Sequence, residues 1–202
     1  MNNAKLINSL IESGVLKTPR LIEAFLNVDR IDFVPPELNT MAYDDIPLPI
    51  GSAQTISQPY TVAFMLELLQ AKPRDRVLDV GSGSGWTTAL LACLSKSVDA
   101  IERVEELVKV SKKNLEKYSF TNIKVHKAKK TLGLKDEQFD KILVSCAAEE
   151  LPPPLLEQLS VGGVMVIPIM NSIVKVIKNS DEDIQMQEYP GFVFVPLIRD
   201  DI

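Results

Sequence analysis

Hydrophobic side chains recur at helical spacing in the first part of the chain. Intervals of three and four residues place one set on a single face of a helix: Leu6, Ile7, Leu10 and Ile11. A second helix is predicted to start at Thr18-Pro19, because a capping residue followed by a first-turn proline is typical of a helix N-terminus. Its inward side chains are predicted to be Leu21, Ile22, Phe25 and Leu26. We therefore expect residues 1–35 to form a helical cap on the main body of the protein.

The helical pattern stops at Phe33-Val34-Pro35-Pro36, and residues 36–60 show no sustained periodicity. A long irregular segment inside a compact domain is usually a functional loop or a disordered one. This segment carries more apolar side chains than a solvated linker would: Tyr43, Ile46, Leu48 and Ile50. We expect a packed loop with a functional role.

After Pro59 the pattern alternates between helices and buried strands. A helix is predicted over 60–71, followed by strand 76–80, helix 86–94, strand 97–102, helix 104–117, strands near 123–126 and 139–145, a short helix at Pro152-Pro153-Pro154 and strand 164–168. Strands 172–178 and 184–196 have no helix between them and should form a hairpin. The order predicts an α/β fold with one doubly wound, mostly parallel, seven-stranded sheet that ends in an antiparallel hairpin. We expect one domain, with the cap and loop in 1–60 and the core in 61–202.

Composition and charge narrow the classes of partner. The chain has 202 residues and a net charge of −5, so we expect no nucleic-acid partner. No apolar run reaches the roughly 18 residues of a membrane-spanning helix, and the pattern of a signal peptide is missing. Cys93 and Cys146 are expected to pack as apolar residues in a reducing cytoplasm. The single histidine, His126, gives no basis for a metal site, and we predict no metal.

The candidate chemistry centres on a glycine-rich turn. Val77-Leu78-Asp79-Val80 has the character of a buried strand and leads into Gly81-Ser82-Gly83-Ser84-Gly85. Glycines permit a tight turn and let a ligand approach the backbone. The helix that begins at Trp86 offers free N–H groups and the positive end of its dipole to an anionic group. We predict that this turn, with Gly81, Ser82, Gly83 and Gly85, binds a nucleotide-type ligand.

The spacing of the glycines separates two classes of cofactor. Dinucleotide-binding turns have G-x-G-x-x-G, whereas this chain has G-x-G-x-G with Trp86 in place of the last glycine. The pattern disfavours NAD and FAD and favours S-adenosylmethionine, which has no pyrophosphate. Asp79, at the end of the strand, is predicted to interact with the ammonium group of this ligand, directly or through water.

Glu102 completes the predicted cofactor site. It lies 21 residues after Gly81, at the end of the second strand. A carboxylate about 20 residues beyond the turn can accept hydrogen bonds from both ribose hydroxyls. The alternative is a glycine turn of another α/β protein with Glu102 as an ordinary surface residue. The combination of Asp79, the turn and Glu102 favours the cofactor.

Several segments, in order along the chain, resemble the protein-L-isoaspartate O-methyltransferases. The most specific is Gln54-Thr55-Ile56-Ser57-Gln58-Pro59-Tyr60, which, with residues 42–51 before it, is similar to the substrate loop of that family. Three more segments are similar: Val28-Asp29-Arg30-Ile31-Asp32-Phe33-Val34-Pro35, Ile101-Glu102-Arg103 and Phe194-Val195-Pro196-Leu197. The resemblance implies a class I methyltransferase, Rossmann-like fold with a helical N-terminal extension.

The resemblance also implies a reaction. A methyl group would pass from S-adenosylmethionine to the α-carboxylate of L-isoaspartyl residues in damaged proteins and peptides, and the ester would then cyclise to a succinimide. Carried over, Ser57 is the catalytic serine, and Thr55 and Ile56 line the substrate pocket. A carboxylate is ionised at neutral pH and needs no general base, so the Ser57 hydroxyl would orient it. The alternative role of Ser57 is to cap the helix that follows.

Two other polar features of the loop have simpler explanations. Asp44 and Asp45 form a tempting acid–base pair, but turn residues are the better interpretation, because free carboxylates would repel an anionic acceptor. Tyr43 is better explained by packing of the loop than by catalysis.

The chain departs from the family pattern at three places. The usual Gly-Asp-Gly, whose aspartate contacts the adenine amine, is replaced by Lys127-Ala128-Lys129, so we expect weaker cofactor binding. Val193 stands where many relatives have arginine, and Glu149-Glu150 adds charge near the site. Two alternatives therefore stay open: a methyltransferase for another acceptor, and a binding module that keeps the fold without turnover. For the leading hypothesis we expect a cytoplasmic monomer.

Overall fold

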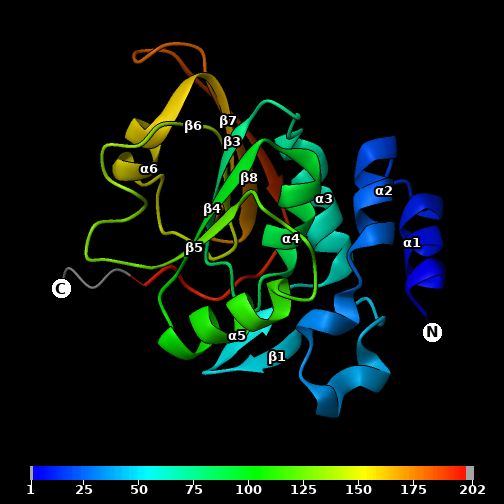
Figure 1. Ribbon diagram of the computed structural model, residues 1–202. Coiled ribbons are helices and arrows are strands. Elements are labelled where there is room, and N and C mark those ends of the chain that lie inside the picture. Colours follow the sequence, from blue (N-terminus) through cyan, green and yellow to red (C-terminus); the bar gives the residue numbers. More distant parts are fainter. Residues whose placement is uncertain (1, 199–202) are drawn as a thin grey trace.

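A seven-stranded sheet forms the centre of the computed structural model, which describes residues 2–198 (Figure 1). The strand order is β5-β4-β3-β6-β7-β8-β9. The strands are β3 (Arg76–Val80), β4 (Ser97–Glu102), β5 (Ile123–Lys127), β6 (Phe139–Val144), β7 (Leu159–Ile169), β8 (Ser172–Lys178) and β9 (Ile184–Pro190). Strands β3 to β7 pair in parallel, whereas β8 pairs antiparallel with both β7 and β9. The predicted fold class is confirmed.

Helices cover the two faces of the sheet unequally. One face carries α3 (Pro59–Leu69), α4 (Trp86–Leu94) and α5 (Glu105–Leu115), and the other carries the short α6 (Pro153–Gln158) (Figure 1). Side chains of β3 alternate between two apolar clusters, because successive residues of a strand point to opposite faces. Within residues 2–198 the structure contains no helix that is both long and apolar enough to cross a bilayer. The layers leave the carboxyl ends of the parallel strands as the natural place for a ligand.

Most element boundaries agree with the sequence pattern, and the last strands differ most. Strand β7 already begins at Leu159, where we expected 164. Strand β9 ends at Pro190, so the predicted strand 184–196 is too long. Pro190 has no N–H to continue the ladder, and Gly191 has a φ of +99° that turns the chain away. The N–H groups of Gly191 and Phe192 both donate to the Asn171 carbonyl, and the chain then runs toward the carboxyl ends of the strands.

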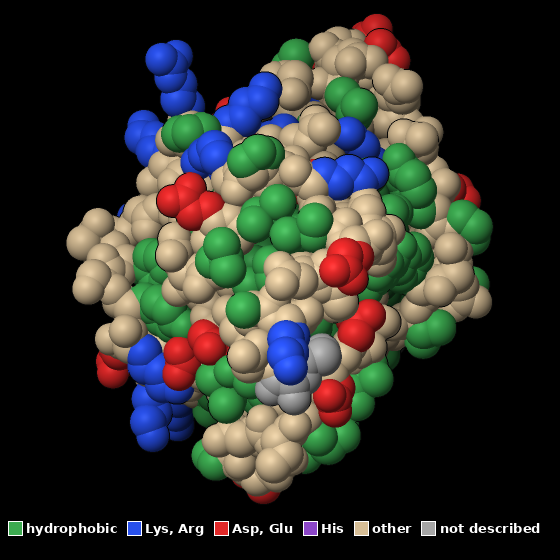
Figure 2. All heavy atoms as spheres, turned by 90° about the vertical axis from the view of Figure 1, so that its right-hand side faces the viewer, with side chains coloured by type: hydrophobic (Ala, Val, Ile, Leu, Met, Phe, Trp, Pro, Cys, Tyr) green, Lys and Arg blue, Asp and Glu red, His purple; other side chains and the backbone are tan. Residues whose placement is uncertain are grey.

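The predicted helical cap is present as α1 (Asn3–Glu12) and α2 (Pro19–Asn27). Thr18 occupies the N-cap position of α2, as predicted, but its hydroxyl donates to Glu67 instead of capping the helix. The prediction that Leu26 faces inward is wrong, because its side chain is 55% exposed. Helix α2 packs along α4 through a narrower stripe that contains Leu21 and Phe25. Figure 2 shows the side of the molecule that carries α1 and α2, where hydrophobic, acidic and basic side chains are mixed.

The segment predicted to be irregular contains regular elements. The 3-10 helix η1 (Arg30–Phe33) precedes the segment, and within it the 3-10 helix η2 (Pro36–Met41) is followed by a hairpin of β1 (Leu48–Gly51) and β2 (Gln54–Ile56). The turn of the hairpin places Ser52 and Ala53 at φ values of +51° and +55°. Hairpin turns with two positive φ angles normally contain asparagine, aspartate or glycine, so this turn has no sequence signal. The division of the chain near residue 60 stays a prediction.

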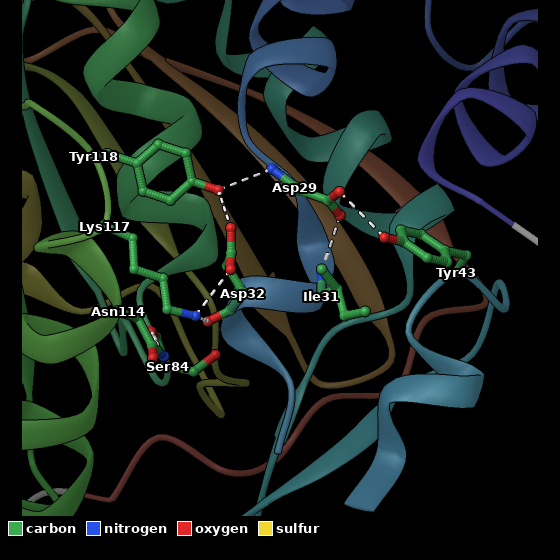
Figure 3. A network of polar contacts seen from close by, with 8 residues as sticks. All are labelled: Asp29, Ile31, Asp32, Tyr43, Ser84, Asn114, Lys117 and Tyr118. Atoms are coloured by element: carbon green, nitrogen blue, oxygen red, sulfur yellow. Dashed lines mark hydrogen bonds and ion pairs between the residues drawn. The ribbon is translucent and has the colours of Figure 1, made fainter. Parts of the chain in front are cut away.

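A polar network fastens the cap to the end of α5 (Figure 3). The Tyr118 hydroxyl accepts from the Asp29 N–H at 3.0 Å and donates to Asp32 at 2.8 Å. Lys117 forms an ion pair with the same Asp32 carboxylate at 2.9 Å. On the other side, the Tyr43 hydroxyl donates to the Asp29 carboxylate at 3.1 Å. The network holds the start of η1 in place, which fixes the chain direction into the 42–57 loop.

Candidate active site

The glycine turn joins β3 to α4 and is held by its neighbours. The N–H groups of Gly81 and Ser82 both donate to the Ile101 carbonyl at the end of β4, and Asn114 of α5 donates to the Ser84 carbonyl at 3.0 Å (Figure 3). A Cβ on Gly85 would lie 2.8 Å from the Ser111 hydroxyl, and its φ is +97°. Only glycine therefore fits at this position, because α5 approaches the turn too closely for a side chain.

Glu102 supports the turn from the adjacent strand. One carboxylate oxygen accepts from the Gly83 N–H at 2.9 Å, and the other accepts from the Val104 N–H at 2.8 Å. The side chain is buried and lines the cleft described below. A carboxylate can accept about four hydrogen bonds, so two places remain for hydroxyl donors of a ligand.

Asp79 lies beneath the turn and is fully buried. Its Oδ2 accepts from the hydroxyls of Thr88 at 2.6 Å and Thr87 at 3.1 Å, and its Oδ1 has no hydrogen-bond partner within the described part of the chain. Burial raises the pKa of Asp79 to about 6, although the threonine hydrogen bonds act in the opposite direction. Asp79 is not among the residues that line the cleft, so its predicted contact with an ammonium group stays a prediction.

The main cleft brings most of the predicted site residues together. Its floor is the turn Gly81-Ser82-Gly83, with Glu102 beside it, and Thr55, Ile56 and Ser57 close it from the 42–57 loop. Further along, Ala128 and Lys129 form part of the wall. The empty volume is about 1130 Å³, which includes space open to solvent. The predicted cofactor residues and loop residues thus face one hollow, with Asp79 and Gly85 supporting it from outside.

A second hollow, the side groove, adjoins the main cleft. The residues that line only the groove are Pro47, Gln58, Thr61, Gly191, Phe192, Val193 and Phe194. Four residues line both hollows: Thr55, Ser57, Ser145 and Val195. No charged side chain within residues 2–198 lines the groove. Ser57 therefore stands at a junction between a cleft suited to a nucleotide and a separate uncharged groove.

Arg30 anchors the loop that carries Ser57. Its guanidinium is fully buried and donates to four backbone carbonyls, at distances of 2.9 to 3.1 Å, from Ala42, Asp44, Ile46 and Ser57. It also lies over the ring of Trp86, the first residue of α4, at 5.4 Å from the centroid. Burial lowers its pKa to about 10, while Asp45 and Asp44 act in the opposite direction, so it stays charged at neutral pH.

The remaining loop residues have supporting roles, as the sequence indicated. Asp45 accepts from the Tyr60 N–H at 2.8 Å and from the Gln58 side chain at 3.1 Å, so Asp45 and not Ser57 caps α3. The alternative role of Ser57 as the cap is therefore wrong. Burial first, and the hydrogen bond to Asp29 second, raise the pKa of Tyr43 to about 12, which suits a packing residue and not a base.

Comparison with known proteins decides the family. The family model described as protein-L-isoaspartate(D-aspartate) O-methyltransferase matches residues 1–201. The chain belongs to this family. It is 44% identical over 185 residues to the protein-L-isoaspartate O-methyltransferase of Petrotoga mobilis, covering 89% of this chain and 87% of that protein, and 40% identical over 199 residues to that of Pyrococcus horikoshii, covering 95% and 90%.

Among solved structures, the chain is similar to a Plasmodium falciparum protein-L-isoaspartate O-methyltransferase in complex with S-adenosyl-L-homocysteine. The TM-score is 0.89 at 27% identity, and the match covers 99% of this chain and all of the other. The correspondence includes the cap and the 42–57 loop as well as the sheet.

Two residues that shape the site were not predicted from the sequence. Arg30 is part of a segment that resembles the family, but nothing local marks it as the anchor of a loop that begins 12 residues later. Ser145 follows the apolar strand β6 and has no motif of its own.

His126, on the edge strand β5, contacts Asp99 at 2.8 Å, and no cluster of possible metal ligands occurs among residues 2–198.

Asp79→Asn should change the pH dependence of stability. The pKa of Asp79 is raised on folding from about 3.8 to about 6, so the native state binds more protons than the unfolded state between these values. As pH rises through this window, the free energy of unfolding of the native protein should fall relative to Asp79→Asn, by up to about 3 kcal/mol. Urea unfolding without ligand at pH 4 to 7 measures it. Glu182→Gln, at an exposed carboxylate, is the control, and a constant difference across pH would contradict the assignment.

Proposed function

We propose that this protein methylates the α-carboxylate of L-isoaspartyl residues in peptides and damaged proteins, with S-adenosylmethionine as methyl donor. Membership of the family supports the proposal. The observation within the molecule that carries it is the position of Ser57, which lines both the main cleft and the side groove. A methyl donor in the cleft and a peptide in the groove would meet at this residue.

The residues of the main cleft fit the donor. Ser82 has a buried hydroxyl without a partner in the described residues, and it lines the cleft at the glycine turn, where a carboxylate of the amino-acid tail would find N–H and O–H donors. Glu102 has two free acceptor positions for ribose hydroxyls. One oxygen of Asp79 has no hydrogen-bond partner among residues 2–198, and a cationic ligand above it would favour its ionised form. S-Adenosylmethionine, when bound, supplies a methyl group on a positively charged sulfur.

The proposed reaction requires positioning more than acid–base chemistry. The acceptor carboxylate is ionised at neutral pH, so no group has to remove a proton from it. The protein has to align a carboxylate oxygen with the methyl carbon and to exclude water, and it can do so because Ser57 is held through its carbonyl by Arg30. Cys146 also lines the cleft, but burial, and then Glu102 and Asp79, raise its pKa to about 12, so its thiol stays neutral and does not compete for the methyl group.

The departures from the family pattern occupy different places. Ala128 and Lys129 lie on the wall of the main cleft, so the missing aspartate would leave the adenine amine without its acidic partner. Val193 lies in the side groove and is 87% exposed. Glu149 and Glu150 are exposed and line neither hollow. Only the first two departures can touch the ligands: Ala128 and Lys129 face the cofactor side, and Val193 faces the groove.

Location and assembly are also part of the proposal. Cys93 and Cys146 are both free thiols, which supports a reducing compartment such as the cytoplasm. We expect a monomer, because the site is complete within one chain: the loop, the glycine turn and the groove all come from the same molecule. Gel filtration and light scattering test the oligomeric state.

Ser57→Ala is the experiment on the proposed function. The native protein, incubated with labelled S-adenosylmethionine and an isoaspartyl peptide, should form a base-labile methyl ester, and a normal-aspartate peptide should not. Ser57→Ala should lose about 10- to 100-fold in kcat/KM, since one hydrogen bond to the carboxylate is removed. The control Ser160→Ala should keep full activity. Absence of ester with the native protein would exclude the proposed function, and full activity of Ser57→Ala would exclude the role of the serine.

Ala128→Asp should strengthen cofactor binding. The new carboxylate would stand where the family has its adenine-binding aspartate, and a hydrogen bond to a charged group is worth enough for about a tenfold lower Kd. Calorimetric titration with S-adenosylmethionine measures the change. Lys130→Gln changes the net charge by the same amount but adds no carboxylate, so a gain in affinity that occurs only in Ala128→Asp reports the hydrogen bond and not the charge. Equal affinity of Ala128→Asp and the native protein would show that the adenine edge is already satisfied by other groups.

A further inference from the structure

Ser145 is a second hydroxyl-bearing residue at the junction that Ser57 occupies. It lines both the main cleft and the side groove, a property it shares with Thr55, Ser57 and Val195. Thr55 and Ser57 belong to the loop before α3, and Val195 belongs to the C-terminal segment. Ser145 differs from these three because it directly follows β6, a strand at the centre of the sheet.

The backbone of Ser145 is fixed next to the glycine turn. Its N–H donates at 2.9 Å to the carbonyl of Val80, the last residue of β3. A Cβ on Gly81 would lie 4.0 Å from the Ser145 Cβ, which shows how close the two strand ends are. The position of the Ser145 side chain relative to the cleft is therefore determined by the central sheet, and sites on rigid elements are more precise than sites on loops.

The hydroxyl of Ser145 is available for a ligand. None of the hydrogen bonds found within residues 2–198 uses it, and the residue is half-buried at the meeting point of the two hollows. A hydroxyl offers one donor and two acceptor positions to a ligand that enters either hollow. None of the described residues that line the groove is charged, so an anionic acceptor there depends on neutral donors.

We propose that Ser145 is a further catalytic residue, whose hydroxyl donates a hydrogen bond to the acceptor carboxylate beside that of Ser57. The inference rests on the proposed function. A carboxylate has two oxygens, and each can accept from one of the two serines while a lone pair stays free. Ser57 from the loop and Ser145 from the sheet would then both bind the acceptor carboxylate, which would fix the plane of the carboxylate relative to the methyl donor.

The charge balance of the reaction defines what this hydrogen bond can do. A lone pair of one carboxylate oxygen forms the new bond to the methyl carbon, the carbon–sulfur bond breaks, and its electron pair passes to the sulfur, which becomes a neutral thioether. The carboxylate loses its negative charge as the ester forms, and no proton moves. Hydrogen bonds to the acceptor are consequently no stronger in the transition state than before it, so Ser145 contributes to binding and orientation more than to lowering the barrier.

The expected signature is a change in KM for the peptide. Ser145→Ala should raise the KM for an isoaspartyl peptide about tenfold and change kcat by less than about threefold. The Kd for S-adenosylmethionine should stay the same. Ser145→Thr, which keeps the hydroxyl, should restore the KM, whereas Ser145→Cys, which keeps the size but has a weak donor, should behave like the alanine variant. Ser97→Ala, at the far end of β4, is the control.

The outcomes separate this inference from the proposed function. If the native protein forms no methyl ester, the proposed function fails before any variant is compared. If the native protein is active and Ser145→Ala keeps its KM, only the role of Ser145 is overturned. An equal rise in KM for the alanine and threonine variants, or a matching change in the Kd for the methyl donor, would also overturn it, because packing and not the hydroxyl would then be responsible.

Discussion

The site depends on one buried cation. The guanidinium of Arg30 has no carboxylate within ion-pair distance among the described residues, and it is stabilised instead by four backbone carbonyls and the face of Trp86. A buried charge is costly unless its hydrogen-bonding groups are satisfied, so the carbonyls must stay where they are for the protein to be stable. They belong to the parts of the 42–57 loop that lie outside the β1–β2 hairpin. Leaving the buried guanidinium without these acceptors would destabilise the fold. This penalty holds the 42–57 loop in its conformation.

This anchor connects the two halves of the site. One of its carbonyls belongs to Ser57, and its aromatic partner begins the helix that follows the glycine turn. The loop and the helix after the glycine turn therefore contact the same side chain, which fixes their positions relative to each other. For a transfer to an acceptor that is already ionised, alignment is the main contribution a protein can make. The junction of the main cleft and the side groove offers neutral hydroxyls, and the described lining of the groove is uncharged. Such surroundings can hold a carboxylate without removing its nucleophilicity.

Local patterns predicted the parts of the structure that local forces determine. The strand–glycine–helix unit and Glu102 follow from residues close in sequence, and the sheet follows from the alternation of buried strands with helices. The hairpin β1–β2 was not predicted because its turn residues, Ser52 and Ala53, adopt positive φ angles although neither is asparagine, aspartate or glycine. Leu26 was misplaced because periodicity marks a face but not its width. Arg30 and Ser145 act through contacts with residues distant in sequence, which no spacing rule describes.

The role of Arg30 as the anchor of the site is tested most directly by the single-turnover rate of methyl transfer by Arg30→Lys, at saturating S-adenosylmethionine and isoaspartyl peptide. Lysine keeps the charge but cannot present a planar set of donors to four carbonyls. Arg30→Lys should transfer the methyl group at least about tenfold more slowly, because a displacement of the acceptor carboxylate by about 1 Å is costly, and its Kd for the methyl donor should stay almost unchanged. A folded Arg30→Lys protein that transfers the methyl group at the native rate would contradict this role.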